Sequence, residues 1–579
     1  MTRAADRDAG PPPMRPTPVG PAPVGPPPVG PPPVGPPPVG PAPSPVGPPR
    51  SAHRFLTRVR RRDGLVGDLV LYLASVLFAA WTAAASTLAP HRAWGALAVP
   101  GYLLASLAVL AQLAARHRAA GARWTGTRAR AWIAGTAWAF TAGAPLVVEA
   151  AQRAAGRGDR AQEEVIVVEQ AGHRLLEHGT PYLSRDAIAA LPLDERLLGY
   201  LPYQPGMALF GLPRALAGAA WWTDARVWFA AVTALTVLAA AALARRGAPN
   251  PGSTPDLRAT PDLGPTPDLG PTPPGLGATP EVRATPDRDA APDVDAMSDL
   301  RATPDRDATP GGAGPEPAGA LLRAVQLSTV LPLSALTIAT GGDDLPVLGL
   351  CLLALALCAA RRPGAAGVAI GMAGALKLFA WPVAAVLIAY AATRGRGSLL
   401  RMTAGAVGLP VLAVLPVLLI DRAALIENVL RFPLGHGLVT SPAQSPLPGH
   451  LIATAVPGGR LIAAGLLGAA ALAIGVRLLR RPPRTAAASA AISGYGLLAA
   501  MLLMPSTRFG YLLYPVALLG WAAAFAGASP ARGRAAGHGA AGRPGCAGSL
   551  PSGDATLDVP EMPGRHAPVR AQRRDGGSV

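Results

Sequence analysis

The chain has 579 residues, of which 50% are hydrophobic and only 15% are charged, and it contains 66 Pro and 67 Gly. No single soluble domain normally has this mixture of apolar residues, Pro and Gly. The apolar residues gather in blocks of about 20, the length that crosses a hydrocarbon core. The net charge of +18 would suit a nucleic-acid-binding protein. The arginines, however, cluster at the ends of apolar blocks, as cytoplasmic anchors do. The composition therefore excludes a soluble enzyme, argues against nucleic acid as a partner and predicts a polytopic membrane protein.

The first 57 residues contain a repeat of Pro-Pro-Pro-Val-Gly and its variants. This repeat favours extended polyproline II and cannot bury a core, so residues 1–57 are predicted to be a disordered cytoplasmic leader. A plain spacer is favoured over a ligand for SH3-type domains. No cleavable signal peptide precedes the first apolar block, which is therefore expected to stay as a membrane anchor.

Apolar blocks that suit membrane spans follow one another along the rest of the chain. In chain order they are residues 65–87, 94–115, 131–150, 226–243, 321–340, 346–360, 365–380, 382–392, 403–420, 461–476, 486–504 and 511–525. The pattern predicts an all-α polytopic membrane protein with about 12 transmembrane helices.

The connections between these blocks alternate between arginine-rich and arginine-poor. By the positive-inside rule, this alternation predicts a multi-pass protein of the cell membrane with both termini in the cytoplasm. Residues 58–246 are then a front transmembrane half with an outer loop at 152–224, and residues 320–528 are a back half with an outer loop at 421–460. Residues 247–319, rich in Pro and Asp, are predicted to be a disordered cytoplasmic insert, and residues 529–579 a disordered cytoplasmic tail.

The first outer loop contains carboxylates and a short apolar stretch. Glu163 and Glu164 open an amphipathic run, and an apolar stretch after Pro205 is too short to span the membrane. That stretch is predicted to be a short interfacial or re-entrant helix. A carboxylate beside it can act as a general base toward a hydroxyl substrate. On spacing alone, however, solvated loop acids are the favoured interpretation of both glutamates.

Two basic residues stand out in the back half. Lys377 is the only lysine in the chain and lies within or at the end of a span, where a cation is costly and indicates function. Its expected partner is a lipid phosphate or a carboxylate of Asp343 or Asp344, and snorkelling to a headgroup is an equally weighted alternative. Arg508 lies at an outer helix end, where it can hold a phosphate bidentately or serve as an interface anchor.

Metal chemistry finds little support in the sequence. The outer-loop histidines and the cysteines have spacings that match no standard ligand set. These residues are His173, His178, His436, His450, Cys351, Cys358 and Cys546. No metal and no cofactor is therefore expected.

Several short motifs occur in an order that resembles a known family. They are Glu164-Val165-Ile166-Val167-Val168, Gly179-Thr180-Pro181-Tyr182, Tyr203-Gln204-Pro205, Gly342-Asp343-Asp344-Leu345, Lys377 before a Pro, and Gln444-Ser445. This order resembles glycosyltransferase family 87, the polyprenyl-phosphate-mannose-dependent α-mannosyltransferases and their relatives, which have the GT-C fold. The similarity covers roughly residues 130–521, without the insert. Glu stands where the family has Asp, and Asp343-Asp344 stand where it has a Gln-x-Asn turn.

The resemblance implies a GT-C-like hexosyltransferase that transfers mannose from a polyprenyl-phosphate donor to a lipid or glycan acceptor of the cell envelope. Glu164 would be the catalytic base, with Glu163 as a second candidate. The implied substrate-binding positions are Lys377, Arg508, Tyr182, Tyr203, Asp343, Asp344 and Gln444. Two other functions stay open. One is a multispan transporter or lipid flippase, and the other is a non-catalytic relative of the family.

Overall fold

The computed structural model describes residues 64–116, 124–246 and 317–527. Within these ranges the chain folds into helices and contains no named strand, and an isolated parallel bridge joins Gln444 to Thr507. This confirms the predicted all-α class. The predicted leader, insert and tail lie outside the described residues, apart from residues 317–319, which begin helix α11.

Eight helical segments are long and apolar enough to cross a membrane. They are α2 (Leu65–Ala85), α3 (Ala89–Ala115), α5 to α6 (Thr127–Ala154), α10 (Ala225–Arg246), α16 (Arg396–Ile420), α19 (Gly459–Arg480), α20 (Ala486–Leu503) and Phe509–Gly527, which includes α21 (Leu513–Gly527). A bent pair, α11 (Pro317–Thr329) and α12 (Pro332–Thr340), passes the same test as one span with a 42° kink. The described residues thus form a multi-pass membrane protein.

Three further apolar helices are shorter. They are α13 (Asp344–Ala359), α14 (Pro363–Leu376) and α15 (Ala380–Ala392). At a rise of about 1.5 Å per residue, none of them spans a full hydrocarbon core alone. Helix α13 is buried almost throughout by its neighbours. The predicted count of twelve crossings requires these three helices and the bent pair all to cross, and it stays a prediction.

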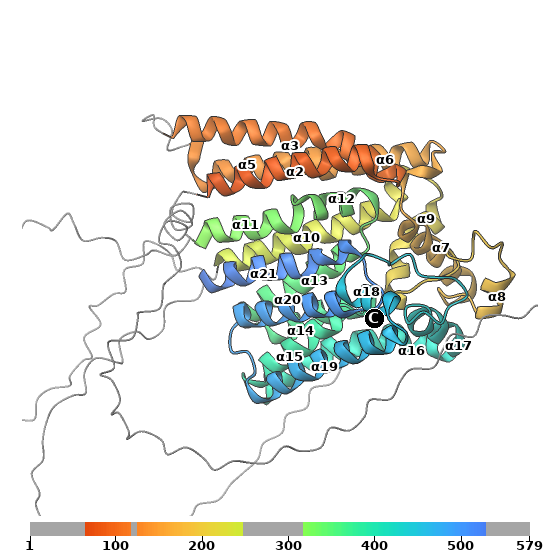
Figure 1. Ribbon diagram of the computed structural model, residues 1–579. Helices are drawn as coiled ribbons and strands as arrows, with labels where there is room; N and C mark the ends of the chain where they lie inside the picture. The colour runs from red at the N-terminus through yellow and green to blue at the C-terminus, as the bar shows by residue number, and fades with distance from the viewer. Residues whose placement is uncertain (1–63, 117–123, 247–316, 528–579) are drawn as a thin grey trace, which may run out of the picture. The chain divides into compact units, whose positions relative to one another are not determined.

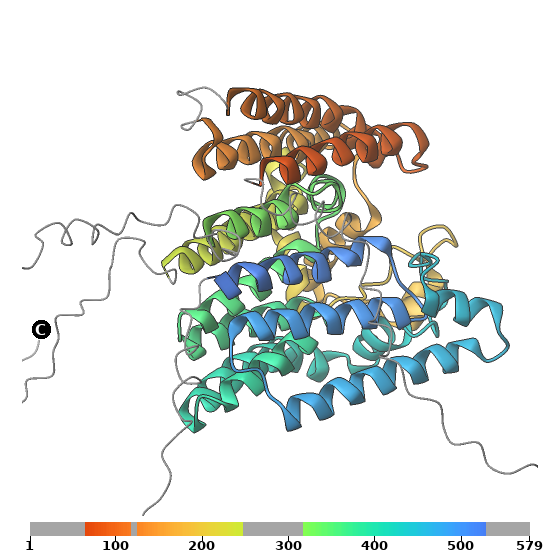
Figure 2. The ribbon, with the colours of Figure 1, turned by 60° about the vertical axis from the view of Figure 1, so that its left-hand side comes forward.

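Small residues allow the central helices to approach one another closely. Gly367 and Gly371 of α14 lie directly against the backbone of α16, where a Cβ on either glycine would meet carbonyl oxygens of Met402 and Gly405. In a bilayer the lipid tails are as apolar as the side chains, so helix association depends on such close packing. Figures 1 and 2 show α2, α3 and α5 along one side of α10 to α12, with α13 to α21 on the other.

The two long loops lie at the same end of the helical bundle (Figure 1). Asn428 accepts a hydrogen bond from the backbone N–H of Leu201 at 2.8 Å, and the rings of Tyr200 and Phe432 stack with centroids 4.2 Å apart. The Tyr200 hydroxyl also donates to Glu427 at 3.0 Å. Loops 155–224 and 421–458 therefore form one packed assembly, and the arginine-rich connections lie at the opposite end of the bundle.

The apolar stretch after Pro205 forms two short helical turns, Pro205–Gly211 and α9 (Leu212–Ala217). The first turn is largely buried. Gly206 packs against the backbone of Ala375 in α14, and the N–H of Gln204 donates to the carbonyl of Leu376 at 3.1 Å. The predicted short helix is thus present, and it contacts the C-terminal end of α14.

Candidate active site

Helix α7 (Glu163–His178) carries the candidate base, and contacts with α6 and with the turn Pro205–Gly211 hold it in place. Its buried face includes Val165 and Val168. One turn further on, Glu169 accepts hydrogen bonds from both terminal nitrogens of Arg153 at 2.8 and 2.6 Å. Gly172 lies against the backbone of Gly211, an approach that no side chain would permit. These contacts hold the first turn of α7 in a defined position.

A chain of alternating charges extends this anchor. Arg153 also donates to Asp224 at 3.0 Å, and Arg226 binds the same carboxylate at 2.8 and 2.9 Å. Burial alone would raise the pKa of Asp224, but the hydrogen bonds and charges of Arg226 and Arg153 lower it to about 2. The Asp224 carboxylate therefore stays ionised and keeps α6, α7 and α10 joined.

Glu164 lies in the first turn of α7 and forms an ion pair with Arg508. Arg508 directly precedes the turn that leads into α21. The Glu164 side chain is 14% exposed and that of Arg508 is 32% exposed. The pair is thus partly shielded and still open to a ligand.

Lys377 occupies the break between α14 and α15 at the same end of the bundle. Its Nζ lies 2.8 Å from Asp343 Oδ2 and 2.6 Å from Asp344 Oδ1. Lys377 therefore binds both of the carboxylates that the sequence suggested as its partners. Tyr514 donates to the same oxygen of Asp344 at 2.9 Å. The ammonium and the carboxylates are therefore buried as a group, because a buried charge is tolerated only when it is paired with an opposite charge.

Aromatic rings surround the Lys377 ammonium. Its Nζ lies 4.9 Å from the ring centroid of Tyr203, 5.5 Å from Phe379 and 5.3 Å from Tyr511, distances at which a ring face attracts a cation. Tyr511 lies within electrostatic range of both Lys377 and Arg508. Tyr511 thus connects the Lys377 cluster to the Glu164–Arg508 pair, so that Glu164, Arg508 and Lys377 gather in one region.

Residues 299–505 match the model of glycosyltransferase family 87. This part of the chain, about a third of its length, is therefore similar to glycosyltransferase family 87. Searches of curated proteins and of solved structures gave no significant match. The match, together with the helical membrane fold, supports a membrane glycosyltransferase.

The matched range covers one part of the candidate site. It contains Asp343, Asp344, Lys377 and Gln444, and it ends just before Arg508. Helix α7 and its Glu164 lie outside it. The support for Glu164 as the candidate base is therefore the motif order in the sequence and its ion pair with Arg508.

Three other predicted site residues have different environments. Glu163 is exposed, and it forms no ion pair within the described ranges. Tyr182 is buried and donates to the carbonyl of Tyr203 at 2.7 Å, and burial raises the pKa of both phenols. Gln444 is exposed, and its side-chain amide donates to the carbonyl of Ser441 at 3.1 Å. Within the described residues, no side-chain hydrogen bond or ion pair joins any of these three to the Glu164–Arg508 pair.

The Gln444 segment nevertheless supports Arg508 through its backbone. The N–H of Thr507 donates to Ala443 at 3.0 Å, and the N–H of Ser445 donates to Thr507 at 2.8 Å. The hydroxyl of Ser445 accepts from the N–H of Phe509 at 2.9 Å. Loop 421–458 thus holds the residues on both sides of Arg508.

Sequence reasoning missed the residues that complete this region. The His91 ring contacts the side chain of Gln162, the residue before α7, and lies within electrostatic range of Arg508. The available signal was the position of His91 in the arginine-poor connection predicted between the first two apolar blocks, which the structure places in the first turn of α3. Among the described residues, no group of three or more His, Cys, Asp or Glu side chains is arranged to hold a metal.

Proposed function

We propose that the chain transfers a hexose, specifically mannose, from a polyprenyl-phosphate donor to a hydroxyl of a cell-envelope lipid or glycan on the outer face of the membrane. The observation that carries this proposal is the Glu164–Arg508 ion pair. It combines a carboxylate suited to proton abstraction with a guanidinium suited to phosphate, at the end of the bundle that has the long loops. The choice of mannose and of the polyprenyl donor derives from the family resemblance.

The proposed reaction requires the ion pair to open. A donor phosphate that binds the Arg508 guanidinium bidentately competes with the Glu164 carboxylate for it. The released carboxylate then accepts the proton of the acceptor hydroxyl. The hydroxyl oxygen forms a bond to the anomeric carbon, and the bond from that carbon to the phosphate oxygen breaks. Polyprenyl phosphate leaves with the electron pair, and the anomeric configuration inverts.

The Lys377 cluster has a different role in this proposal. Two carboxylates already neutralise the ammonium, so its charge is not freely available to a leaving phosphate. The cluster fixes the outer end of α14 beside Tyr203 and Tyr511. We infer that Lys377 shapes the donor pocket, while Arg508 carries the phosphate contact.

Orientation in the membrane follows from charge. The connections opposite the candidate site carry paired and clustered arginines, such as Arg361-Arg362 and Arg480-Arg481. Loops of this kind stay in the cytoplasm during insertion. We infer that the candidate site faces the non-cytoplasmic side, where a lipid-linked donor meets envelope acceptors, and that both termini are cytoplasmic.

A non-catalytic relative and a transporter are the competing functions. The kink between α11 and α12 and the break at Lys377 are features that transporters use at substrate sites. Here, the break at Lys377 is occupied by the ion pairs of Lys377 with Asp343 and Asp344, so its local role is to assemble this cluster. Donor binding without turnover would identify a non-catalytic relative.

The test is Glu164→Gln in membranes supplied with labelled polyprenyl-phosphate mannose and an envelope acceptor fraction. Loss of the base is expected to lower turnover by about 10²-fold to 10⁴-fold. Glu163→Gln is the matched control, because it removes the same charge from the same helical turn at an exposed position without an ion pair. Equal turnover in both variants would remove Glu164 from the base role.

A further inference from the structure

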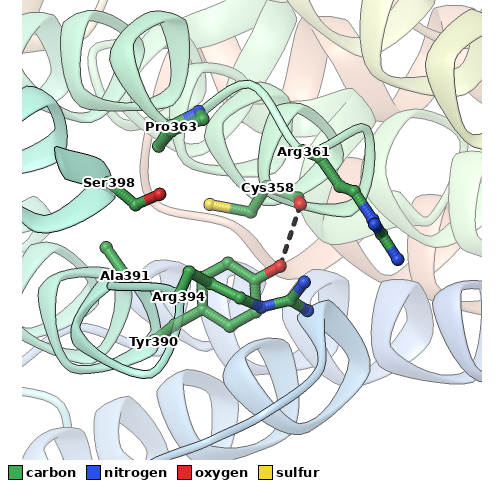
Figure 3. Close-up of a pocket in the computed structure, with 7 residues that line it drawn as sticks. All are labelled: Cys358, Arg361, Pro363, Tyr390, Ala391, Arg394 and Ser398. Atoms are coloured by element: carbon green, nitrogen blue, oxygen red, sulfur yellow. Dashed lines mark hydrogen bonds between the residues drawn. The ribbon is translucent and has the colours of Figure 1, made fainter. Parts of the chain in front are cut away.

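A cavity of about 210 Å³, drawn with its lining residues in Figure 3, lies at the arginine-rich end of the bundle. It opens where α13 ends, α14 begins, α15 ends and α16 begins. Its lining residues are Cys358, Arg361, Pro363, Tyr390, Ala391, Arg394 and Ser398. None of them is acidic.

Arg361 has an unusual backbone. Its φ of 58° lies in the left-handed region, and no other non-glycine residue of the described ranges has a positive φ. It closes α13 with two backbone hydrogen bonds, from its own N–H to Cys358 at 3.1 Å and from the N–H of Arg362 to Leu357 at 2.9 Å. Helix ends of this type usually carry Gly, because a Cβ is strained there. A strained backbone held beside a cavity points to a function for the side chain.

Arg394 adds a second guanidinium to the cavity. It lies 4.9 Å from the ring centroid of Tyr390 and donates to the carbonyl of Arg484 at 3.1 Å. Tyr390 in turn donates to the carbonyl of Cys358 at 3.0 Å (Figure 3). Both arginines lie within electrostatic range of Tyr390. The Tyr390 ring thus contacts Arg394, and both residues line the cavity.

Neither guanidinium is neutralised by a carboxylate. Within the described residues, the ion pairs involve other arginines, and Arg361 and Arg394 take part in none. By contrast, Arg130, Arg153 and Arg226 at other points of the bundle are each bound to buried acids. Arg361 and Arg394 therefore offer their charge to a ligand.

We propose that this cavity binds a phosphate group, from either an anionic lipid headgroup or a soluble phosphate compound. Guanidinium groups match phosphate oxygens bidentately, and the hydroxyl of Ser398 adds a neutral donor. The cavity also adjoins the first turns of α14 and α16, whose dipoles favour an anion. This site is separate from the proposed transfer site and does not depend on that function.

The test uses the full-length chain in nanodiscs of phosphatidylcholine. Thermal unfolding is measured after addition of inorganic phosphate, or after inclusion of phosphatidylglycerol in the bilayer. A ligand that binds only the folded state raises the melting temperature. We expect such a rise in the native chain. A rise with inorganic phosphate identifies a soluble phosphate ligand, and a rise with phosphatidylglycerol alone identifies a lipid headgroup.

Paired variants decide whether the cavity is responsible. Arg361→Gln with Arg394→Gln is expected to abolish the rise. Arg245→Gln with Arg246→Gln, which removes the same charge from the arginine-rich end of α10 outside the cavity, is expected to retain it. An equal rise in both double variants, or no rise in the native chain with either ligand, would overturn the proposal.

A single substitution separates folding from binding. Arg361→Gly suits the left-handed backbone, so it is expected to raise the melting temperature in the absence of phosphate. The same variant is expected to show a smaller phosphate-dependent rise. If the phosphate-dependent rise stays at its native size in this well-folded variant, Arg361 is not a phosphate ligand.

Discussion

Glu164 and Arg508 form an ion pair between the first turn of α7 and the residue that precedes the last helical segment. Each partner is fixed by its own half of the chain. The Arg153–Glu169 pair anchors α7, and the backbone pairing of Gln444 with Thr507 anchors Arg508. The candidate site therefore exists only when the front and back halves are assembled.

The first prediction concerns Arg508 and the donor. Arg508→Gln is expected to raise the KM for the polyprenyl-phosphate donor by about 10-fold to 100-fold, since a hydrogen bond to a charged group contributes about 1.5–3 kcal/mol. Arg508→Lys keeps the charge and loses the bidentate fork, so it should give an intermediate KM. Donor titrations with membranes of each variant measure the effect. Arg422→Gln, at an exposed position of loop 421–458, is the control. If Arg508→Gln leaves the KM for the donor unchanged, Arg508 is not the phosphate contact.

The second prediction separates the two interpretations of Lys377. Lys377→Met leaves Asp343 and Asp344 buried without their cation, which is expected to cost about 3–5 kcal/mol of stability. The triple variant Lys377→Met, Asp343→Asn and Asp344→Asn removes all three charges and should recover most of that loss. Thermal unfolding of the purified chain in detergent compares them. A stable single variant that no longer binds donor would instead make Lys377 a direct substrate contact.

Hydropathy was sufficient to predict the helices of this fold. Each apolar block predicted from the sequence corresponds to a helix or helix pair, because about 20 apolar residues have no other stable form in a bilayer. The breaks were less predictable. Lys377 ends α14 because its charge needs the carboxylates that follow α12, and hydropathy contains no information about that pairing.

The candidate site was predicted only in part. The motif order directed attention to Glu164, and the cost of a buried cation directed it to Lys377 and its acids. The sequence did not pair Glu164 with Arg508, because their proximity depends on how the two halves pack. His91 and Tyr511 were missed for the same reason. Each lies in an apolar or connecting stretch of the sequence, and only its neighbours in the folded chain show that it belongs to the candidate site.

The third prediction is a pH dependence carried by Asp224. Its folded-state pKa of about 2 lies below the ordinary 3.8, so its stabilising effect is complete above pH 3.8 and is lost as the pH falls toward 2. The shift corresponds to about 2 kcal/mol. Asp224→Asn should therefore unfold at a lower temperature than the native chain at neutral pH, with a smaller difference at pH 3. A difference independent of pH would mean that shape, rather than charge, accounts for the effect.

The fourth prediction is the side of the membrane on which the candidate site lies. Asp194 is exposed in the first long loop, and Arg481 is exposed at the arginine-rich end. In a background without native cysteines, Asp194→Cys should react with a membrane-impermeant thiol reagent added to intact cells, and Arg481→Cys should react only after the cells are opened. The charge distribution is the reason, because arginine-rich connections are retained in the cytoplasm. The reverse labelling pattern would expose the ion pair to cytosolic rather than envelope acceptors. In that case the proposed transfer to an envelope hydroxyl fails even if Glu164 proves to be a base.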